Sequence, residues 1–255
     1  MTEPGASTFA RILRHHLATG VIGRDDSVLV QFAGTFDEMV CAEVGLTNVT
    51  FVNIAPDSPS SEISGAAIDA HEMPYQAGSY DHVIGHSGLH HCSRPHEALH
   101  EMYRIATKTV LFVENQDSAL MRLATKAGVV SWHELPAVVA ADYASGGVDG
   151  TGVPNFVYRW TRREVTKAVA CFDPAYEIPI EFHTEWNLGS GRVASLGLQR
   201  RLGLSPDQAE RVFTRGQKVM NSVASRQGNI FAATIRKDLA RLQPWMASPQ
   251  EMKHS

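Results

Sequence analysis

The run VLVQFAGTF occupies residues 28–36 and is the first of several short apolar runs that end in small or polar residues. The later runs are VTFVN at 49–53, SYDHVIG at 79–85 and TVLFVE at 109–114. Between them lie segments such as Pro95 to Ile105, whose apolar residues recur with helical spacing. Short buried strands that alternate with helices predict a mostly parallel sheet with right-handed crossovers. Ligands bind at the carboxyl ends of the strands in such a sheet.

Further elements are predicted on both sides of this region. Residues 6–18 have helical spacing, with Ser7 as the expected N-cap. Thr161 and Glu164 form the pattern of a capping box, and Ser205-Pro206 begins another helix. The remaining expectations are helices over 37–44, 120–130 and 192–202, and strands over 177–188 and 229–237.

The spacing of these elements predicts one α/β domain that carries an insertion. Residues 1–118 hold an N-terminal helix and the ligand-binding part of the core. Residues 119–160 contain many glycines and few periodic apolar positions, so we interpret them as a lid on the substrate side. Residues 161–243 complete the core, and residues 244–255 form a tail.

The composition excludes several classes of protein. A net charge of -4 and the absence of a basic stripe argue against a nucleic-acid partner. Cys41, Cys92 and Cys171 are odd in number and widely spaced, so we expect reduced thiols and a cytoplasmic location. No run of 18 apolar residues occurs, and charged residues interrupt the N-terminal segment, so neither a membrane span nor a signal peptide is expected.

Three motifs carry a family resemblance. The first is Asp69-Ala70-His71-Glu72-Met73-Pro74-Tyr75, and the second is Gly78-Ser79-Tyr80-Asp81-His82-Val83-Ile84. The third is Leu89-His90-His91 followed by the helix from Pro95. Together they resemble the class I S-adenosylmethionine (SAM)-dependent methyltransferases, in particular the type 11-like enzymes that act on small molecules. The resemblance implies a Rossmann-like, seven-stranded, mostly parallel sheet with helices on both faces and an antiparallel last strand.

The same resemblance implies SAM as the cofactor and assigns residues to it. Asp69 matches the acceptor of the adenine amine, and Ala70 would offer its backbone N–H to the ring. Asn53 ends the second strand, where a polar side chain binds the ribose hydroxyls. His86 corresponds to a position whose backbone touches the methionine part. The full set of expected cofactor-binding residues is Phe32, Ala33, Gly34, Asn53, Ile54, Asp69, Ala70, His86 and Ser87.

The turn after the first strand departs from the family pattern. Family members usually carry three alternating glycines there, whereas this chain has Phe32-Ala33-Gly34-Thr35-Phe36. One interpretation is a variant loop in which Gly34 alone allows close approach of the cofactor. The alternatives are a non-catalytic scaffold, whose pocket the two rings would block, and an enzyme with SAM-independent chemistry.

Methyl transfer to oxygen needs a group that removes the acceptor's proton. Sugar O-methyltransferases of this family place a histidine and an acidic residue at matching positions, which implies His90 or His91 as the base and Glu114 as its partner. The competing interpretation is that these side chains cap a helix or bind backbone. We therefore expect methyl transfer to a small hydroxylated acceptor, namely a sugar or glycosylated metabolite.

The segment Val153 to Trp160 resembles part of methyltransferases that act on glycans or secondary metabolites. It implies His133, Tyr158, Arg159 and Trp160 as substrate-binding residues, with ordinary lid packing as the alternative. The run His96-Glu97-Ala98-Leu99-His100 matches H-E-x-x-H, but we expect a solvated helix face and no metal. The helices between Arg192 and Arg226 could form a homodimer face.

Overall fold

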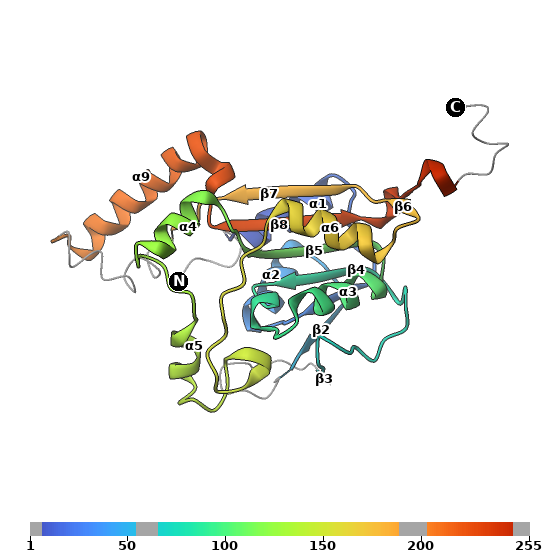
Figure 1. Cartoon of the computed structure of the whole chain (residues 1–255), viewed down its shortest axis with the longest axis horizontal. Helices are drawn as coiled ribbons and strands as arrows, with labels where there is room; N and C mark the ends of the chain where they lie inside the picture. The colour runs from blue at the N-terminus through green and yellow to red at the C-terminus, as the bar shows by residue number, and fades with distance from the viewer. Residues whose placement is uncertain (1–6, 55–65, 189–202, 247–255) are drawn as a thin grey trace.

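The computed structural model describes residues 7–54, 66–188 and 203–246. Within these residues the main sheet has seven strands in the order β3-β2-β1-β4-β5-β8-β7 (Figure 1). The pairs from β3 to β5 are parallel, and β8 is antiparallel to both β5 and β7. The predicted Rossmann-like, mostly parallel α/β fold with a late antiparallel strand is therefore confirmed. The strands are β1 (Val28–Gln31), β2 (Val49–Asn53), β3 (Ala66–Ala67), β4 (Tyr80–His86), β5 (Ala106–Asn115), β7 (Ile180–Glu185) and β8 (Ile230–Arg236).

The helices begin where the capping signals place them. The side chains of Ser7, Thr161 and Ser205 each accept a backbone N–H at a helix start, and the last two form capping boxes with Glu164 and Gln208. The α-helices are α1 (Thr8–Ala18), α2 (Thr35–Val44), α3 (Pro95–Ile105), α4 (Ala119–Lys126), α5 (Leu135–Ala140), α6 (Arg162–Phe172) and α9 (Pro206–Ala224). Short 3-10 turns are η2 (Leu89–His91), η3 (Val148–Gly150), η4 (Ser225–Gln227), η5 (Lys237–Leu239) and η6 (Pro244–Met246).

The sheet separates two hydrophobic cores. Helices α3 and α6 cover one face, and α1 and α2 cover the other (Figure 1). Adjacent residues of β4 point to opposite faces, so Val83 packs in the first core and Ile84 in the second. A strand buried on both faces must be apolar at successive positions, which explains the apolar runs in the sequence.

Residues 119–160, which we refer to as the insertion, lie beside the carboxyl ends of the strands (Figure 1). The insertion includes α4, which matches the expected helix over 120–130, and α5, which the sequence analysis did not anticipate. Its last residue, Trp160, is fully buried and pairs with Gln116 just beyond β5. Two glycines allow close backbone approach: a Cβ on Gly147 would lie 1.9 Å from the Val153 oxygen, and one on Gly152 would lie 1.8 Å from the Tyr143 oxygen.

The expected strand over 177–188 is divided. Its first part is β6 (Tyr176–Glu177), which pairs with β9 (Arg241–Leu242) in a separate small sheet, and its second part is β7. Pro179 lies between them and cannot donate a hydrogen bond to a strand neighbour, which accounts for the break. The helix expected over 192–202 falls outside the described residues.

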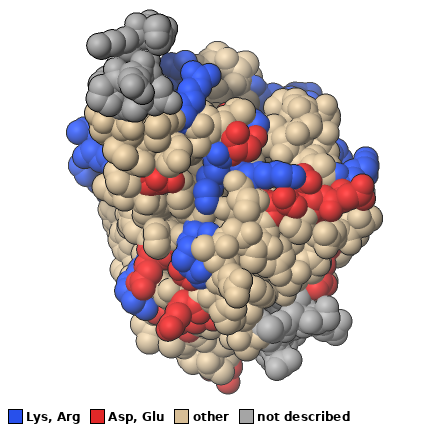
Figure 2. Space-filling model, turned by 90° about the vertical axis from the view of Figure 1, so that its right-hand side faces the viewer, with Lys and Arg blue, Asp and Glu red and all other residues tan. Residues whose placement is uncertain are grey.

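The exposed charges are mixed in sign on the face shown in Figure 2. Lys and Arg side chains alternate there with Asp and Glu, without a continuous basic area among the described residues. Each described helix is too short or too polar to cross a lipid bilayer.

Candidate active site

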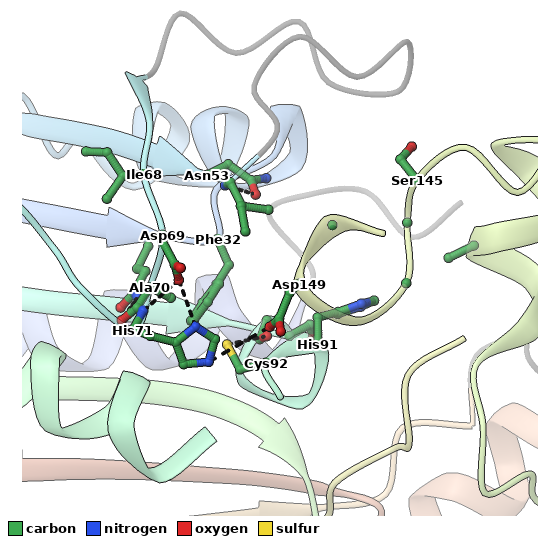
Figure 3. Close-up of a pocket in the computed structure, with 18 residues that line it drawn as sticks. Phe32, Asn53, Ile68, Asp69, Ala70, His71, His91, Cys92, Ser145 and Asp149 are labelled. Atoms are coloured by element: carbon green, nitrogen blue, oxygen red, sulfur yellow. Dashed lines mark hydrogen bonds and ion pairs between the residues drawn. The ribbon is translucent and has the colours of Figure 1, made fainter. Parts of the chain in front are cut away.

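A pocket lies at the carboxyl ends of β1, β2 and β4, facing the insertion (Figure 3). Its volume is about 260 Å³. The expected cofactor residues Phe32, Asn53, Ile54, Asp69, Ala70 and Ser87 all line it. Ala33, Gly34 and His86, also expected there, are not part of its wall. The other lining residues are Gln31, Ile68, His71, Gly88, His91, Cys92, Ala137, Ser145, Gly146, Gly147, Asp149 and Gly150.

Asp69 is held in place by His71, a residue that the sequence analysis did not single out. Its Oδ1 atom accepts hydrogen bonds from the His71 backbone N–H at 2.9 Å and from His71 Nδ1 at 2.7 Å. The buried His71 ring accepts the Arg94 N–H through Nε2 at 3.2 Å, which leaves Nδ1 as the donor to Asp69. The His71 backbone hydrogen bond lowers the pKa of Asp69. Asp69 lines the pocket, and its side chain is half-exposed.

Phe32 replaces the first glycine of the family pattern and has a left-handed backbone with φ of 63°. This conformation is unfavourable for a bulky side chain. The ring contacts the core and fills the space above Gly88, where an added Cβ would lie 2.0 Å from Phe32 Cγ. Phe36, by contrast, packs against the other core and against His86 at a ring distance of 5.6 Å. One of the two rings therefore narrows the pocket, and neither closes it.

Asn53 lines the pocket, but backbone groups engage both its polar atoms. Its Nδ2 donates to the Ala33 oxygen at 2.8 Å, and its Oδ1 accepts from the Ile54 N–H at 2.7 Å. The amide oxygen keeps a second lone pair, so it can still accept from a ribose hydroxyl. His86, outside the pocket, bonds Asp37 at 2.7 Å and stacks on Phe9 at 4.6 Å.

The insertion forms the opposite wall of the pocket. Asp149 accepts the Ser93 N–H at 2.9 Å and lies 3.9 Å from His71 Nε2, across from Asp69 (Figure 3). A Cβ on Gly150 would lie 3.1 Å from the Ile54 side chain, so the insertion also contacts the end of β2. Asp149 belongs to no motif of the sequence, so its place in the pocket wall was not predicted.

The expected catalytic residues meet at the edge of the pocket. Buried Glu114, at the end of β5, binds His90 Nδ1 at 2.6 Å and accepts the Leu89 N–H at 2.7 Å. Glu134, from the insertion, lies 3.1 Å from His90 Nε2 and 3.5 Å from His91 Nε2. Of the two rings, His91 is the one that lines the pocket. We refer to His90, His91, Glu114 and Glu134 as the histidine–glutamate cluster.

Burial and ion pairing set the charges in this cluster. Burial disfavours the charged ring of His90, but Glu114 and Glu134 outweigh it and raise its pKa to about 10. Burial, reinforced by the neighbouring His90, lowers the pKa of His91. The hydrogen bond with His90 lowers the pKa of Glu134 to about 2. Two carboxylates therefore face one cation at the edge of the pocket.

The four expected substrate-binding residues lie outside the pocket wall. Trp160 is fully buried, and Tyr158 bonds Glu164 and His96. Arg159 binds the Ser131 oxygen at 2.8 Å and lies over the Trp132 ring at 5.8 Å. His133 is exposed on the same surface, next to Glu134.

The H-E-x-x-H motif does not bring its histidines together on a ligand. His96 bonds Glu164 at 3.0 Å, and the ring of His100 packs on Phe172 at 5.0 Å. Among the described residues, the set whose potential ligand atoms lie within 4.8 Å of one another is His90, His91 and Glu134.

Comparisons with known proteins agree with this geometry. Residues 32–113 match the sequence model of a family described as "Methyltransferase domain". A search of curated proteins finds no match.

Solved structures are similar in fold at low sequence identity. Phosphoethanolamine N-methyltransferase 2 of Haemonchus contortus, solved with phosphomonomethylethanolamine and S-adenosylhomocysteine, has a TM-score of 0.51 at 13% identity, covering 93% of this chain and 54% of that one. A candidate sarcosine dimethylglycine methyltransferase from Galdieria sulphuraria has a TM-score of 0.51 at 14% identity, covering 90% and 84%. The [4+2]-cyclase SpnF has a TM-score of 0.50 at 14% identity, covering 92% and 85%.

Residues 32–113 therefore match a methyltransferase domain, and the fold is that of the class I SAM-dependent methyltransferases, so the resemblance found in the sequence is confirmed. The cofactor that the matched domain implies is SAM. The residues present fit its nucleoside half, because Asp69 offers a carboxylate oxygen and Ile54, Ile68 and Ala70 supply an apolar wall. Among the described residues, buried Gln31 Oε1 at the same wall has no hydrogen-bond partner, so it can accept a further hydrogen bond.

Proposed function

We propose that this methyltransferase transfers a methyl group to a hydroxyl of a small acceptor, namely a sugar or glycosylated metabolite. The observation that carries the proposal is the position of the histidine–glutamate cluster: His91 lines the same pocket as Asp69 and Ser87. An acceptor that reaches the cofactor therefore also reaches the cluster.

When bound, SAM supplies an electrophilic methyl group on a sulfonium sulfur. Transfer forms the O–C bond and breaks the C–S bond, whose electron pair stays on sulfur, and the hydroxyl proton must leave. Asp69 and Asn53 would hold the nucleoside, and His90, His91 and Glu114 would bind the hydroxyl and assist loss of its proton. Alignment of the hydroxyl with the methyl group contributes the rest of the rate enhancement.

The charges of the pocket favour a neutral acceptor. Its described wall contains the carboxylate side chains Asp69 and Asp149 and contains neither Lys nor Arg. A phosphorylated or carboxylated acceptor would lack a cationic partner there. Beyond the pocket, we propose that the surface around His133, Tyr158 and Arg159, supported from beneath by buried Trp160, contacts the remainder of the acceptor.

The test has two stages. Isothermal titration with S-adenosylhomocysteine should detect binding by the full chain, and the Asp69→Ala variant should weaken it by at least ~10-fold, since it removes a charged hydrogen-bond partner. Methyl transfer from labelled SAM should then be screened against neutral sugars, phosphorylated sugars and amines. Preference for amines or phosphorylated sugars would contradict the proposed acceptor.

Variants of the cluster separate catalysis from cofactor binding. His91→Ala and Glu114→Gln should each lower turnover by ~10²-fold or more while S-adenosylhomocysteine still binds. His15→Ala is the matched control, because His15 lies exposed on α1. If His90→Ala, His91→Ala and Glu114→Gln all kept wild-type turnover, the cluster would have no role in the reaction.

Phe32 favours one alternative function, in which the fold serves as a scaffold or as an enzyme without methyl transfer. Its ring narrows the wall where the family pattern has glycine. The fold alone does not decide between these functions, since a [4+2]-cyclase shares it. No binding of S-adenosylhomocysteine at millimolar concentration would favour this alternative.

A further inference from the structure

We propose that His90, His91 and Glu134 form a site for a divalent transition-metal ion of the zinc type, at the edge of the cofactor pocket. The metal binding itself is independent of the proposed reaction, and only the catalytic role of the ion rests on that proposal.

The spacing of the three ligand atoms is the first support. Glu134 Oε2 lies 3.1 Å from His90 Nε2 and 3.5 Å from His91 Nε2. Two ligands that each bind one zinc ion at about 2.0–2.1 Å with tetrahedral angles are separated by about 3.3 Å. The distance of 3.5 Å between His91 Nε2 and Glu134 is long for a hydrogen bond. The His91 ring is held beside this position by packing on His90 at 4.5 Å and by a backbone hydrogen bond with Gly147. A shared ion accounts for both distances.

The surroundings of His90 match those of a metal-bound imidazole. Its Nδ1 is held by Glu114 at 2.6 Å, which aims Nε2 at the other two ligand atoms. A carboxylate behind a ligating histidine is the common outer contact of such rings and fixes their orientation. Asn155 is almost fully buried, and its side-chain Nδ2 donates to the backbone oxygen of His90 at 3.0 Å. The backbone N–H of Glu134 donates to the backbone oxygen of Asn155 at 3.1 Å. The insertion is thereby tied to the turn that carries both histidines.

The charge and the ligand types point to the class of ion. Glu114 and Glu134 are two carboxylates beside two rings, so a doubly positive ion would neutralise the cluster. Two imidazoles and one carboxylate suit zinc, manganese, cobalt or ferrous iron, whereas magnesium prefers oxygen ligands. Three protein ligands leave a further coordination position, as catalytic metal sites do.

The position beside the pocket suggests what the ion does. Since His91 lines the pocket, an acceptor hydroxyl at that wall can bind the ion through its oxygen. Metal coordination lowers the pKa of a bound hydroxyl, so its proton passes to water and the oxygen attacks the methyl carbon. The reaction then requires an acceptor with an accessible hydroxyl, in agreement with the sugar acceptor proposed above.

The test begins with the full chain after treatment with a chelator. Titration with Zn²⁺ and Co²⁺ alone should show a single tight site per chain, and Mg²⁺ should not compete. Visible absorption of the Co²⁺ form should show bands of a four- or five-coordinate site. His91→Ala and Glu134→Ala should abolish this site, and Glu114→Gln should weaken it by ~10–100-fold because it removes the outer contact. Glu97→Ala, at a half-exposed position of α3 where the side chain pairs with Arg94, is the matched control and should bind as the wild type does.

Two results would overturn the proposed metal site. One is failure of the metal-free chain to bind any of these ions while it still binds S-adenosylhomocysteine, which shows that it is folded. The other is ion binding that His91→Ala and Glu134→Ala leave unchanged. Full methyl transfer in excess chelator would remove the catalytic role of the ion and leave the proposed function intact. Tight ion binding without methyl transfer to any hydroxylated acceptor would support the metal site and contradict the proposed function.

Discussion

The two walls of the pocket are stabilised in different ways. The sheet wall, which carries Asp69 and Phe32, follows strands packed between two hydrophobic cores. The insertion wall has few fully buried apolar side chains, among them Val138 and Trp160, and depends on backbone contacts that glycines permit. The candidate site therefore combines one half that the packed sheet positions with another half that a small number of specific contacts hold in place.

The largest expected effect is at the anchor of the insertion. Trp160→Ala should lower the free energy of unfolding by about 3–5 kcal/mol, because the fully buried ring packs on Phe112 at 5.4 Å and on His96 at 5.0 Å. Urea denaturation measures this loss. Trp132→Ala is the control, since that ring is 47% exposed and should cost less than about 1 kcal/mol. Equal losses for the two variants would mean that Trp160 does not anchor the insertion.

The next largest effect on stability is expected at the glycine contacts of the insertion. Gly147→Ala should destabilise the chain by about 1–3 kcal/mol, because the new Cβ would meet the Val153 oxygen. Binding of S-adenosylhomocysteine should weaken as well, since Gly147 lines the pocket. Gly216→Ala in α9 is the control: nothing lies within 4 Å of its new Cβ, so it should stabilise the helix by about 0.5–1 kcal/mol. Unchanged stability and ligand affinity of Gly147→Ala would show that the insertion adapts more freely than the two-wall comparison implies.

A pH-dependent effect is expected on the sheet side, away from the pocket. Hydrogen bonds from Lys108 and His82 hold the pKa of Asp26 well below its usual range, with His82 Nε2 at 2.9 Å. A carboxyl with a depressed pKa stabilises the fold above its unfolded pKa, and this contribution disappears as the pH falls. Asp26→Asn should therefore cost about 1–2 kcal/mol at pH 7, after allowance for the partly exposed Lys108.

The difference between Asp26→Asn and the wild type should shrink below about pH 4, near the pKa of an unperturbed Asp. Denaturation midpoints at pH 7 and pH 3.5 measure the change. If the stability difference between Asp26→Asn and the wild type widened as the pH fell, the lowered pKa of Asp26 would be contradicted.

The smallest effect on stability is expected at Phe32. Phe32→Gly relieves the strain of a φ of 63° but removes a ring that contacts the core, so the two changes should cancel to within about 1 kcal/mol. Affinity for S-adenosylhomocysteine should rise, because the ring narrows the pocket. Phe36→Gly is the matched control: it lies within helix α2 and outside the pocket, so it should lose stability and leave the affinity unchanged. A large stability loss for Phe32→Gly would show that its ring is chiefly a core residue.

The sequence was most informative where structure follows from periodicity and local capping. Strands β1 and β4 are apolar at successive positions, and Thr161 and Ser205 mark helix starts that the structure confirms. The sequence also placed Asp69 and His90 at the sheet edge, because strand ends converge there in a parallel sheet.

Other features depend on contacts between distant segments. The role of His71 becomes visible only when Arg94 is brought beside it, 23 positions later in the chain. Glu134 meets His90 across 44 positions, and it lies in the insertion, which has few periodic apolar residues. The pairing of β6 with β9, more than 60 positions later in the chain, likewise joins distant segments. Pattern analysis of a short window cannot contain such pairings.

Strand β8 lies between β5 and β7 in the sheet, and this position affects the order of folding. Synthesis proceeds from the N-terminus, so β7 is made well before the strand that must separate it from β5. Until residues 230–236 emerge from the ribosome, β5 and β7 expose unpaired edges to solvent and to each other. A nascent chain of this topology has to delay closure of its sheet, and it is most exposed to misassembly and chaperone capture during that interval.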